Sequence, residues 1–105
     1  MNILLDECTP HAVKKRLPYL AIRTVQEMGW SGVKNGALIK LADQQFDVFI
    51  TTDKNLRYQQ NLAHVKLAFL LLPTNSVPVV VALIPQIEAA LTTIKLGDFV
   101  EIPMP

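Results

Sequence analysis

Two short apolar runs in this chain each end in an acid. Residues 3–5 (Ile-Leu-Leu) lead directly into Asp6, and residues 48–52 (Val-Phe-Ile-Thr-Thr) lead into Asp53. Continuous runs of large or β-branched apolar residues are typical of strands that are buried on both faces of a parallel sheet. In open α/β sheets, ligands bind outside the carboxyl ends of the strands. The pattern therefore predicts two neighbouring strands that bring Asp6 and Asp53 to one edge.

Two interpretations of these acids stay open. Converging carboxylates are common ligands of Mg²⁺ or Mn²⁺, so Asp6 and Asp53 are candidate metal ligands. Each Asp could instead cap the helix that follows its strand. Glu7 adjoins Asp6, and successive side chains of an extended segment diverge, so we expect only one of the two to face the site. We favour Asp6 for the metal, with Glu7 orienting water.

Composition limits the classes of protein to be considered. The chain has 105 residues, of which 50% are apolar and 18% charged, and we expect residues 1–105 to form a single domain. A net charge of +1 gives no general affinity for polyanions, so any nucleic-acid binding has to be local. The single cysteine, Cys8, excludes an intramolecular disulfide and a cysteine-rich zinc site, and we expect it to be a small buried side chain.

The sequence also bears on location. Asp6 and Glu7 interrupt the first apolar run, which argues against a signal peptide. The longest apolar stretch, residues 79–84, lies between two prolines and is far too short to span a bilayer. We therefore expect a cytoplasmic protein without a membrane segment.

Expected strands and helices alternate along the chain. Strands are predicted at residues 3–5, 21–25, 48–51, 67–72 and 99–102, and helices at residues 10–17 (capped by Thr9), 37–45, 54–62 and 77–96 (bent at Pro85). A glycine-rich loop, residues 26–36, separates the second strand from the second helix. This alternation is typical of an α/β fold with a mostly parallel sheet of four or five strands, covered on both faces.

The segment 52–61 is unusually polar for a chain that is so apolar elsewhere, and it follows the third strand. Lys54 and Arg57 are candidates for phosphate contacts, and Tyr58 is a candidate for stacking on a base. Three amides complete the candidates for contacts to metal-held water or a sugar edge: Asn55, Gln60 and Asn61. The alternative is a solvated loop and short helix without a binding role.

The last predicted helix is apolar on more than one face between residues 77 and 94. A helix of this kind needs cover on most sides, which predicts a homodimer with this helix in the interface. The substitution Val80→Glu or Leu83→Glu should then yield monomers or insoluble protein. The alternative is that the two-sided sheet already buries these apolar residues.

Three segments resemble the small bacterial PIN-like domains related to VapC-type toxin ribonucleases. They are LLDE…P near the start, QEMGW-x-G-x-KNG, and FDVFITTDKNLRYQQNL, and together they extend from Asn2 to about Leu72. The resemblance implies a three-layer α/β/α domain with an acidic pocket that binds Mg²⁺ or Mn²⁺ and cleaves RNA phosphodiesters. It also implies pairing with an antitoxin from the same operon. Asp6 resembles the first-strand acid of that pocket, and Asp53 the later strand-end acid.

The chain departs from this family at two positions. PIN domains supply three or four acids, but Ala37 stands where similar sequences have Glu, and Asn55 where many have a second Asp. Two hypotheses follow: a Mg²⁺- or Mn²⁺-dependent endoribonuclease of the toxin type, or a PIN-like module that binds RNA or a protein partner without cleavage. The catalytic candidates are Asp6, Glu7, Asp53 and Asn55, and the substrate-contact candidates are Lys34, Asn35, Lys54, Arg57, Tyr58, Gln60 and Asn61.

Overall fold

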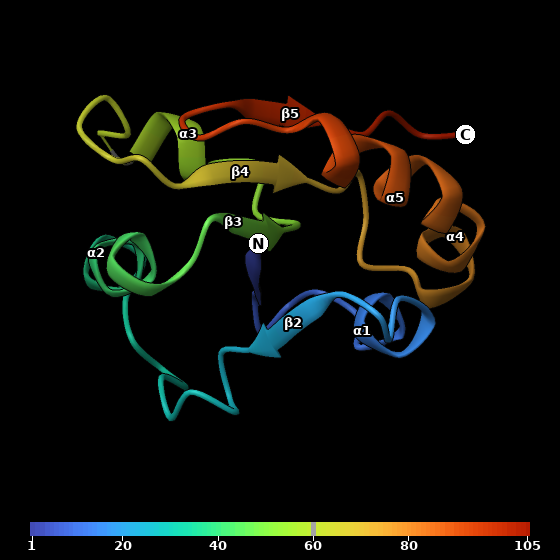
Figure 1. Ribbon diagram of the computed structural model, residues 1–105, viewed down its shortest axis with the longest axis horizontal. Helices are drawn as coiled ribbons and strands as arrows, with labels where there is room; N and C mark the ends of the chain where they lie inside the picture. The colour runs from blue at the N-terminus through green and yellow to red at the C-terminus, as the bar shows by residue number, and fades with distance from the viewer. Residues whose placement is uncertain (60) are drawn as a thin grey trace.

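A computed structural model describes residues 1–59 and 61–105 of the chain, and its centre is one parallel sheet (Figure 1). The strands are β1 (Asn2–Leu5), β2 (Ala21–Thr24), β3 (Val48–Thr51), β4 (Ala68–Leu71) and β5 (Phe99–Glu101). They lie in the order β2-β1-β3-β4-β5, and every neighbouring pair is parallel. The predicted α/β class is confirmed, and the sheet has five strands, all of them parallel.

Helices cover both faces of the sheet. Figure 1 shows α2 (Asn35–Gln45) and α3 (Leu56–Gln59) on one side, and α1 (Ala12–Arg16), α4 (Val77–Ala82) and α5 (Ile84–Thr93) on the other. The pleat of β1 divides its side chains between two cores: Ile3 and Leu5 pack on the side of α1, α4 and α5, and Leu4 packs on the side of α2 and α3. This is the predicted three-layer arrangement.

The strand order places a topological switch point between β1 and β3. The chain moves outward from β1 to β2, and then returns to the other side of β1 to build β3, β4 and β5. The helices that follow β1 and β3, which are α1 and α3, cover opposite faces of the sheet, and sheets of this kind bind their ligands at the carboxyl ends of such a pair of strands. Leu5 pairs with Ile50 in the register of these strands. The prediction that the first and third strands are neighbours is confirmed.

The first helix begins later than predicted. Its N-cap residue is His11, and the Thr9 hydroxyl is buried without a hydrogen-bond partner among the described residues. The backbone N–H of Thr9 instead donates to the Asp6 carbonyl at 3.1 Å, in a turn that delays the helix start. The prediction that Thr9 caps this helix is wrong.

The predicted long helix at the C-terminal end is two helices. The break falls at Leu83, and Pro85 lies in the first turn of α5, where its missing N–H removes no helical hydrogen bond. Val80 and Leu83 are 0% and 2% exposed and belong to the core under α4 and α5. The expectation that these two residues lie on a dimer surface is therefore wrong, because the sheet already buries them.

No helix in the described part of the chain is both long enough and apolar enough to cross a membrane.

Candidate active site

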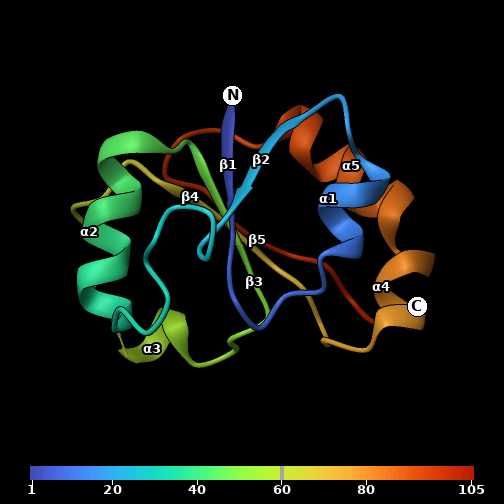
Figure 2. The ribbon, with the colours of Figure 1, turned by 90° about the horizontal axis from the view of Figure 1, so that it is seen from below.

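The two acids lie at the carboxyl ends of neighbouring strands. Asp6 follows β1 directly, and its backbone N–H donates to the Ile50 carbonyl at 2.9 Å, which extends the ladder with β3. Asp53 lies two residues beyond β3, and both acids are half-buried. Figure 2 shows β1 and β3 ending toward the lower edge of the view, beside α3 and the start of α2. The fold thus brings Asp6 and Asp53 to one edge of the sheet, as the sequence predicts.

One hydroxyl connects the two acids. Thr51, the last residue of β3, is 0% exposed. Its Oγ1 donates to Asp6 Oδ2 at 2.8 Å and accepts from the backbone N–H of Asp53 at 3.1 Å. A single buried side chain therefore fixes the carboxylate of one acid and the backbone of the other. The sequence reasoning missed this residue, because a threonine at the end of a buried strand also fits strand propensity alone.

Asp53 joins three elements. Its Oδ2 accepts from the side-chain amide of Asn35, in the first turn of α2, at 3.1 Å. Its Oδ1 accepts from the backbone N–H of Asn55, just before α3, at 3.0 Å. Two of the predicted site residues, Asn35 and Asn55, are thus in contact with Asp53. Asn55 contributes its main chain, and its side chain is exposed.

Asp6 and Glu7 diverge, as expected for neighbours in an extended segment. Asp6 Oδ1 accepts from the Glu7 backbone N–H at 2.9 Å, whereas Glu7 Oε1 accepts from the backbone N–H of Gly32 at 2.9 Å. Gly32 has φ of +78°, a left-handed conformation that favours glycine. Glu7 therefore holds the loop between β2 and α2 against the site, and Asp6 faces Thr51.

The same loop is held at its other end by Glu27. The carboxylate of Glu27 accepts from Lys14 and from the backbone N–H of Thr24. These two hydrogen bonds, the one from Lys14 above all, lower the pKa of Glu27 from 4.5 to about 2. Glu7 and Glu27 thus hold the glycine-rich loop in a fixed course past the acids.

Cys8 is exposed at the rim of this site. Its Sγ lies 3.5 Å from Asp6 Oδ2 and accepts from the Thr52 hydroxyl at 3.0 Å. The expectation of a buried cysteine is wrong, because the turn after Asp6 carries Cys8 outward from the sheet edge.

The acids have no cationic partner within residues 1–59 and 61–105. The ion pairs described there are Lys14–Glu27 and Arg57–Glu101, and neither involves Asp6 or Asp53. A carboxylate has about four lone-pair positions, so the hydrogen bonds made by each acid leave room for a further ligand. Half-buried carboxylates without a compensating charge favour a bound cation.

The donor set decides which cation fits. Among the described residues, no group of three or more His, Cys, Asp or Glu side chains is arranged to hold a metal. The site supplies the carboxylates of Asp6 and Asp53. Mg²⁺ is commonly held by one or two carboxylates and several waters, with substrate phosphates completing the shell. The residues present therefore fit an ion of this kind.

The remaining candidates of the polar segment separate into two groups. Lys54 and Tyr58 line a hollow beyond Asp53, at the ends of β4 and β5. Arg57 does not line this hollow, but its guanidinium bonds Glu101, which does, at 3.0 Å and lies 4.1 Å from the centroid of the Phe99 ring. Arg57 thus secures α3 to β5, and Lys54 is the cation of this segment that borders the site.

Other candidates lie away from the acids. Asn61 accepts from the backbone N–H of Ala63 and lines a hollow beside α2. Ala37 lines that same hollow and is exposed, so its position does not face Asp53. Lys34 is the exposed N-cap residue of α2. Gln60 lies outside the described residues.

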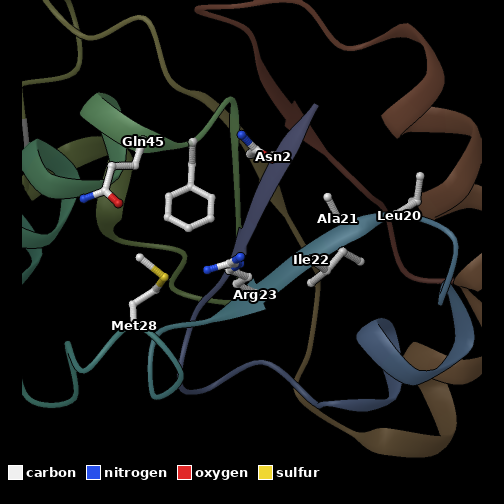
Figure 3. A pocket seen from close by; sticks show the side chains of 8 residues that line it. Asn2, Leu20, Ala21, Ile22, Arg23, Met28 and Gln45 are labelled. Atoms are coloured by element: carbon white, nitrogen blue, oxygen red, sulfur yellow. The ribbon is translucent and has the colours of Figure 1, made fainter.

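A further hollow lies at the opposite end of the first two strands. Its volume is about 450 Å³, and Figure 3 shows Arg23 and Met28 among its side chains. Asn2 and Ala21, the first residues of β1 and β2, also line it. Because the acids lie at the carboxyl ends of the strands, this hollow is separate from the candidate site.

The Thr51 bridge makes a direct prediction about stability. Thr51→Val keeps the shape of the side chain but leaves Asp6 Oδ2 and the Asp53 N–H without this partner. We expect the free energy of unfolding, measured by urea denaturation, to fall by about 1–3 kcal/mol. Thr51→Ser, which keeps the hydroxyl, is the matched control, and a loss as large as that of the valine variant would contradict the bridging role.

Comparison with known proteins assigns no family to this geometry. No protein-family model, curated protein or solved structure matches the chain. The functional interpretation therefore depends on the acids, their partners and the sequence segments that surround them.

Proposed function

We propose that this chain is a PIN-like, Mg²⁺- or Mn²⁺-dependent endoribonuclease of the toxin type. One observation carries the proposal: at the carboxyl ends of β1 and β3 the Thr51 hydroxyl donates to the half-buried carboxylate of Asp6 and accepts from the backbone N–H of Asp53, and neither acid has a cationic partner among the described residues. Such a pair is suited to hold a divalent cation against a phosphodiester.

Each residue has a defined part in this proposal. Asp6 and Asp53 hold the ion, while Thr51 and Asn35 fix the orientation of the two acids. When bound, Mg²⁺ or Mn²⁺ supplies Lewis acidity toward water and the phosphate. Glu7 acts as a positioning residue, because its Oε1 holds the Gly32 loop. The exposed ammonium of Lys54 attracts the RNA backbone electrostatically.

The sequence segments add independent support. The resemblance to PIN-like domains implies that Asp6 and Asp53 are pocket acids, and both residues follow the ends of adjacent strands. It does so in a three-layer α/β/α architecture, which the resemblance also implies. A metal-dependent nuclease is therefore the function that fits both the sequence and the geometry best.

A second candidate function is a PIN-like module that binds RNA or a protein partner without cleavage. Two observations favour it: Ala37 supplies no acid, and Asn55 approaches Asp53 with a backbone N–H rather than a carboxylate. With fewer acids, the ion is held more weakly, and charge on the reacting phosphate is less well stabilised.

Incubation with single-stranded RNA separates the two functions. We expect the purified chain to cut a labelled, unstructured RNA in Mn²⁺ and to leave it intact in EDTA. RNA that binds but stays uncut in Mg²⁺ and in Mn²⁺ would overturn the nuclease proposal in favour of the binding module.

The proposal also concerns partners and location. A cytoplasmic setting, an RNA substrate, a cognate antitoxin and self-association into a homodimer belong to it. In α4 and α5 the buried apolar residues are Val80, Ile87 and Leu91, so the surface left for a dimer includes the exposed Val77, Ala82 and Ala89. Light scattering at micromolar concentration tests the dimer, and the mass of one chain throughout that range would contradict it.

A further inference from the structure

The hollow beyond Asp53, which Lys54 and Tyr58 line, lies at the carboxyl ends of β4 and β5. Its volume is about 450 Å³, within the size range of small-molecule sites. It lies between the start of α3 and the residues that follow the last two strands, so three separate segments of the chain form its walls. Neither Asp6 nor Asp53 lines this hollow, so it is a candidate binding site beside the acidic pair.

The walls of the hollow differ in chemistry. Leu72 and Ile102, which are 0% and 7% exposed, supply an apolar side. Tyr58 supplies an aromatic ring that is 79% exposed and so open to a ligand. Lys54 and Asn55 add polar groups on the side of the acids. An apolar wall, an exposed ring and a few polar groups together suit a flat, heteroaromatic ligand.

The polar groups of the hollow suit the edge of a base. Glu101 lines the wall opposite α3, and its Oε1 is already bonded to Arg57. A carboxylate accepts hydrogen bonds from the N–H groups on the edge of a base. The same ion pair holds α3 and β5 in place, since Arg57 also lies over the Phe99 ring.

The hollow and the acids share a residue. Asn55 lines the hollow, and its backbone N–H donates to Asp53 Oδ1 at 3.0 Å. The hollow and Asp53 are thus linked through a single residue. In RNA, a base and the phosphate of the same nucleotide are neighbours of this kind.

We propose that this hollow binds one unpaired nucleobase of single-stranded RNA, stacked on Tyr58, and thereby places the adjoining phosphate at Asp6 and Asp53. The inference rests on the proposed function, because it takes the acids as the place where the phosphate lies. Stacking distinguishes little between bases, so the hollow selects for an unpaired base rather than for a particular sequence.

The test measures binding in EDTA, so that it does not depend on cleavage. The probe is a fluorescein-labelled RNA hexamer of mixed sequence without secondary structure, and the readout is anisotropy over a range of salt concentrations. We expect Tyr58→Ala to weaken binding by about 10- to 100-fold, the effect of losing one stacked base. Tyr58→Phe, which keeps the ring, should bind within about threefold of the unmodified chain.

The salt dependence and a second tyrosine provide the controls. Because Tyr58 contacts a base, the slope of log Kd against log salt should be the same with and without its ring, whereas Lys54→Ala should reduce that slope by about one. Tyr19, which is 64% exposed, lines another hollow beside Met1 at the opposite end of β1. Tyr19→Ala should leave binding unchanged.

Three results would overturn the inference: no binding of the hexamer to the unmodified chain, unchanged binding by Tyr58→Ala, or equal losses for the Ala and Phe variants. The same experiments, together with RNA cleavage in Mn²⁺, distinguish failure of this inference from failure of the proposed function. Loss of binding in Tyr58→Ala, combined with no RNA cleavage in Mn²⁺, would support the base site and overturn the nuclease. Normal RNA cleavage in Mn²⁺, combined with RNA binding that Tyr58→Ala leaves unchanged, would support the nuclease and overturn the base site.

Discussion

Asp53→Asn is expected to lower the rate of Mn²⁺-dependent RNA cleavage by about 100-fold or more. The substitution removes the negative charge that holds the cation, and losing one group that stabilises charge in a reaction of this type costs two to three orders of magnitude. The asparagine retains an oxygen that can accept from the Asn55 N–H, so we expect the fold to survive. Asp6→Asn should have an effect of the same size. Gel assays of labelled RNA under single-turnover conditions provide the rates.

The chain offers a matched control at the other end of the same strand. Asp47 immediately precedes β3, is half-buried, and accepts from the backbone N–H of Asn2 at 2.7 Å. Asp47→Asn changes the net charge by the same amount as Asp53→Asn and should leave cleavage unchanged. Equal rates for the Asp47 and Asp53 variants would contradict the role of Asp53 in catalysis.

The double variant Asp6→Asn, Asp53→Asn gives a further test of the pair. Residues that act as one unit are strongly non-additive, so removal of the second acid should cost little once the first is lost. Effects that multiply would indicate two independent roles rather than one shared ion.

Asn35→Asp is expected to strengthen Mn²⁺ binding by about tenfold, equivalent to about 1.4 kcal/mol. Asn35 Nδ2 lies 3.1 Å from Asp53 Oδ2, so an aspartate here adds a third carboxylate beside the acidic pair. Without metal the like charges repel, and the free energy of unfolding should fall; with Mn²⁺ the third ligand should more than restore it. Calorimetric titration and thermal denaturation with and without Mn²⁺ measure both effects.

Ala37→Glu is the matched control for this gain. It adds the same charge two residues along α2, at the position where the family resemblance places an acid, but in the hollow that Asn61 and His64 also line. We expect no change in Mn²⁺ affinity. Stronger binding by the Ala37 variant than by the Asn35 variant would contradict the observed orientation of α2.

The buried strands were the most predictable part of the fold. The run at residues 48–51 predicts β3 with the bounds that the structure shows, because a central strand buried on both faces is marked by uninterrupted apolar residues. The same runs placed Asp6 and Asp53 at strand ends, and the parallel order then brought them together. This part of the site follows from local pattern and the geometry of parallel sheets.

Helix starts and side-chain directions were harder to predict from the sequence. A shift of two residues turns a side chain by about 200° around a helix, which is why Asn35 rather than Ala37 faces Asp53. The partners of Arg57 are Glu101 and Phe99, more than forty residues along the chain, and no local pattern indicates them. The contributions of Thr51 and Cys8 likewise depend on contacts between segments that are distant in sequence.

The most direct test of the account is a calorimetric titration of the metal-free chain with Mn²⁺, together with the Asp6→Asn and Asp53→Asn variants. If the two carboxylates hold one ion, the unmodified chain should bind Mn²⁺ and gain thermal stability, because a ligand that prefers the folded state raises its stability. Each single variant should lose that heat and that gain. Absence of heat and of a thermal shift at millimolar Mn²⁺ in the unmodified chain, or equal binding by all three proteins, would contradict a shared metal site at Asp6 and Asp53.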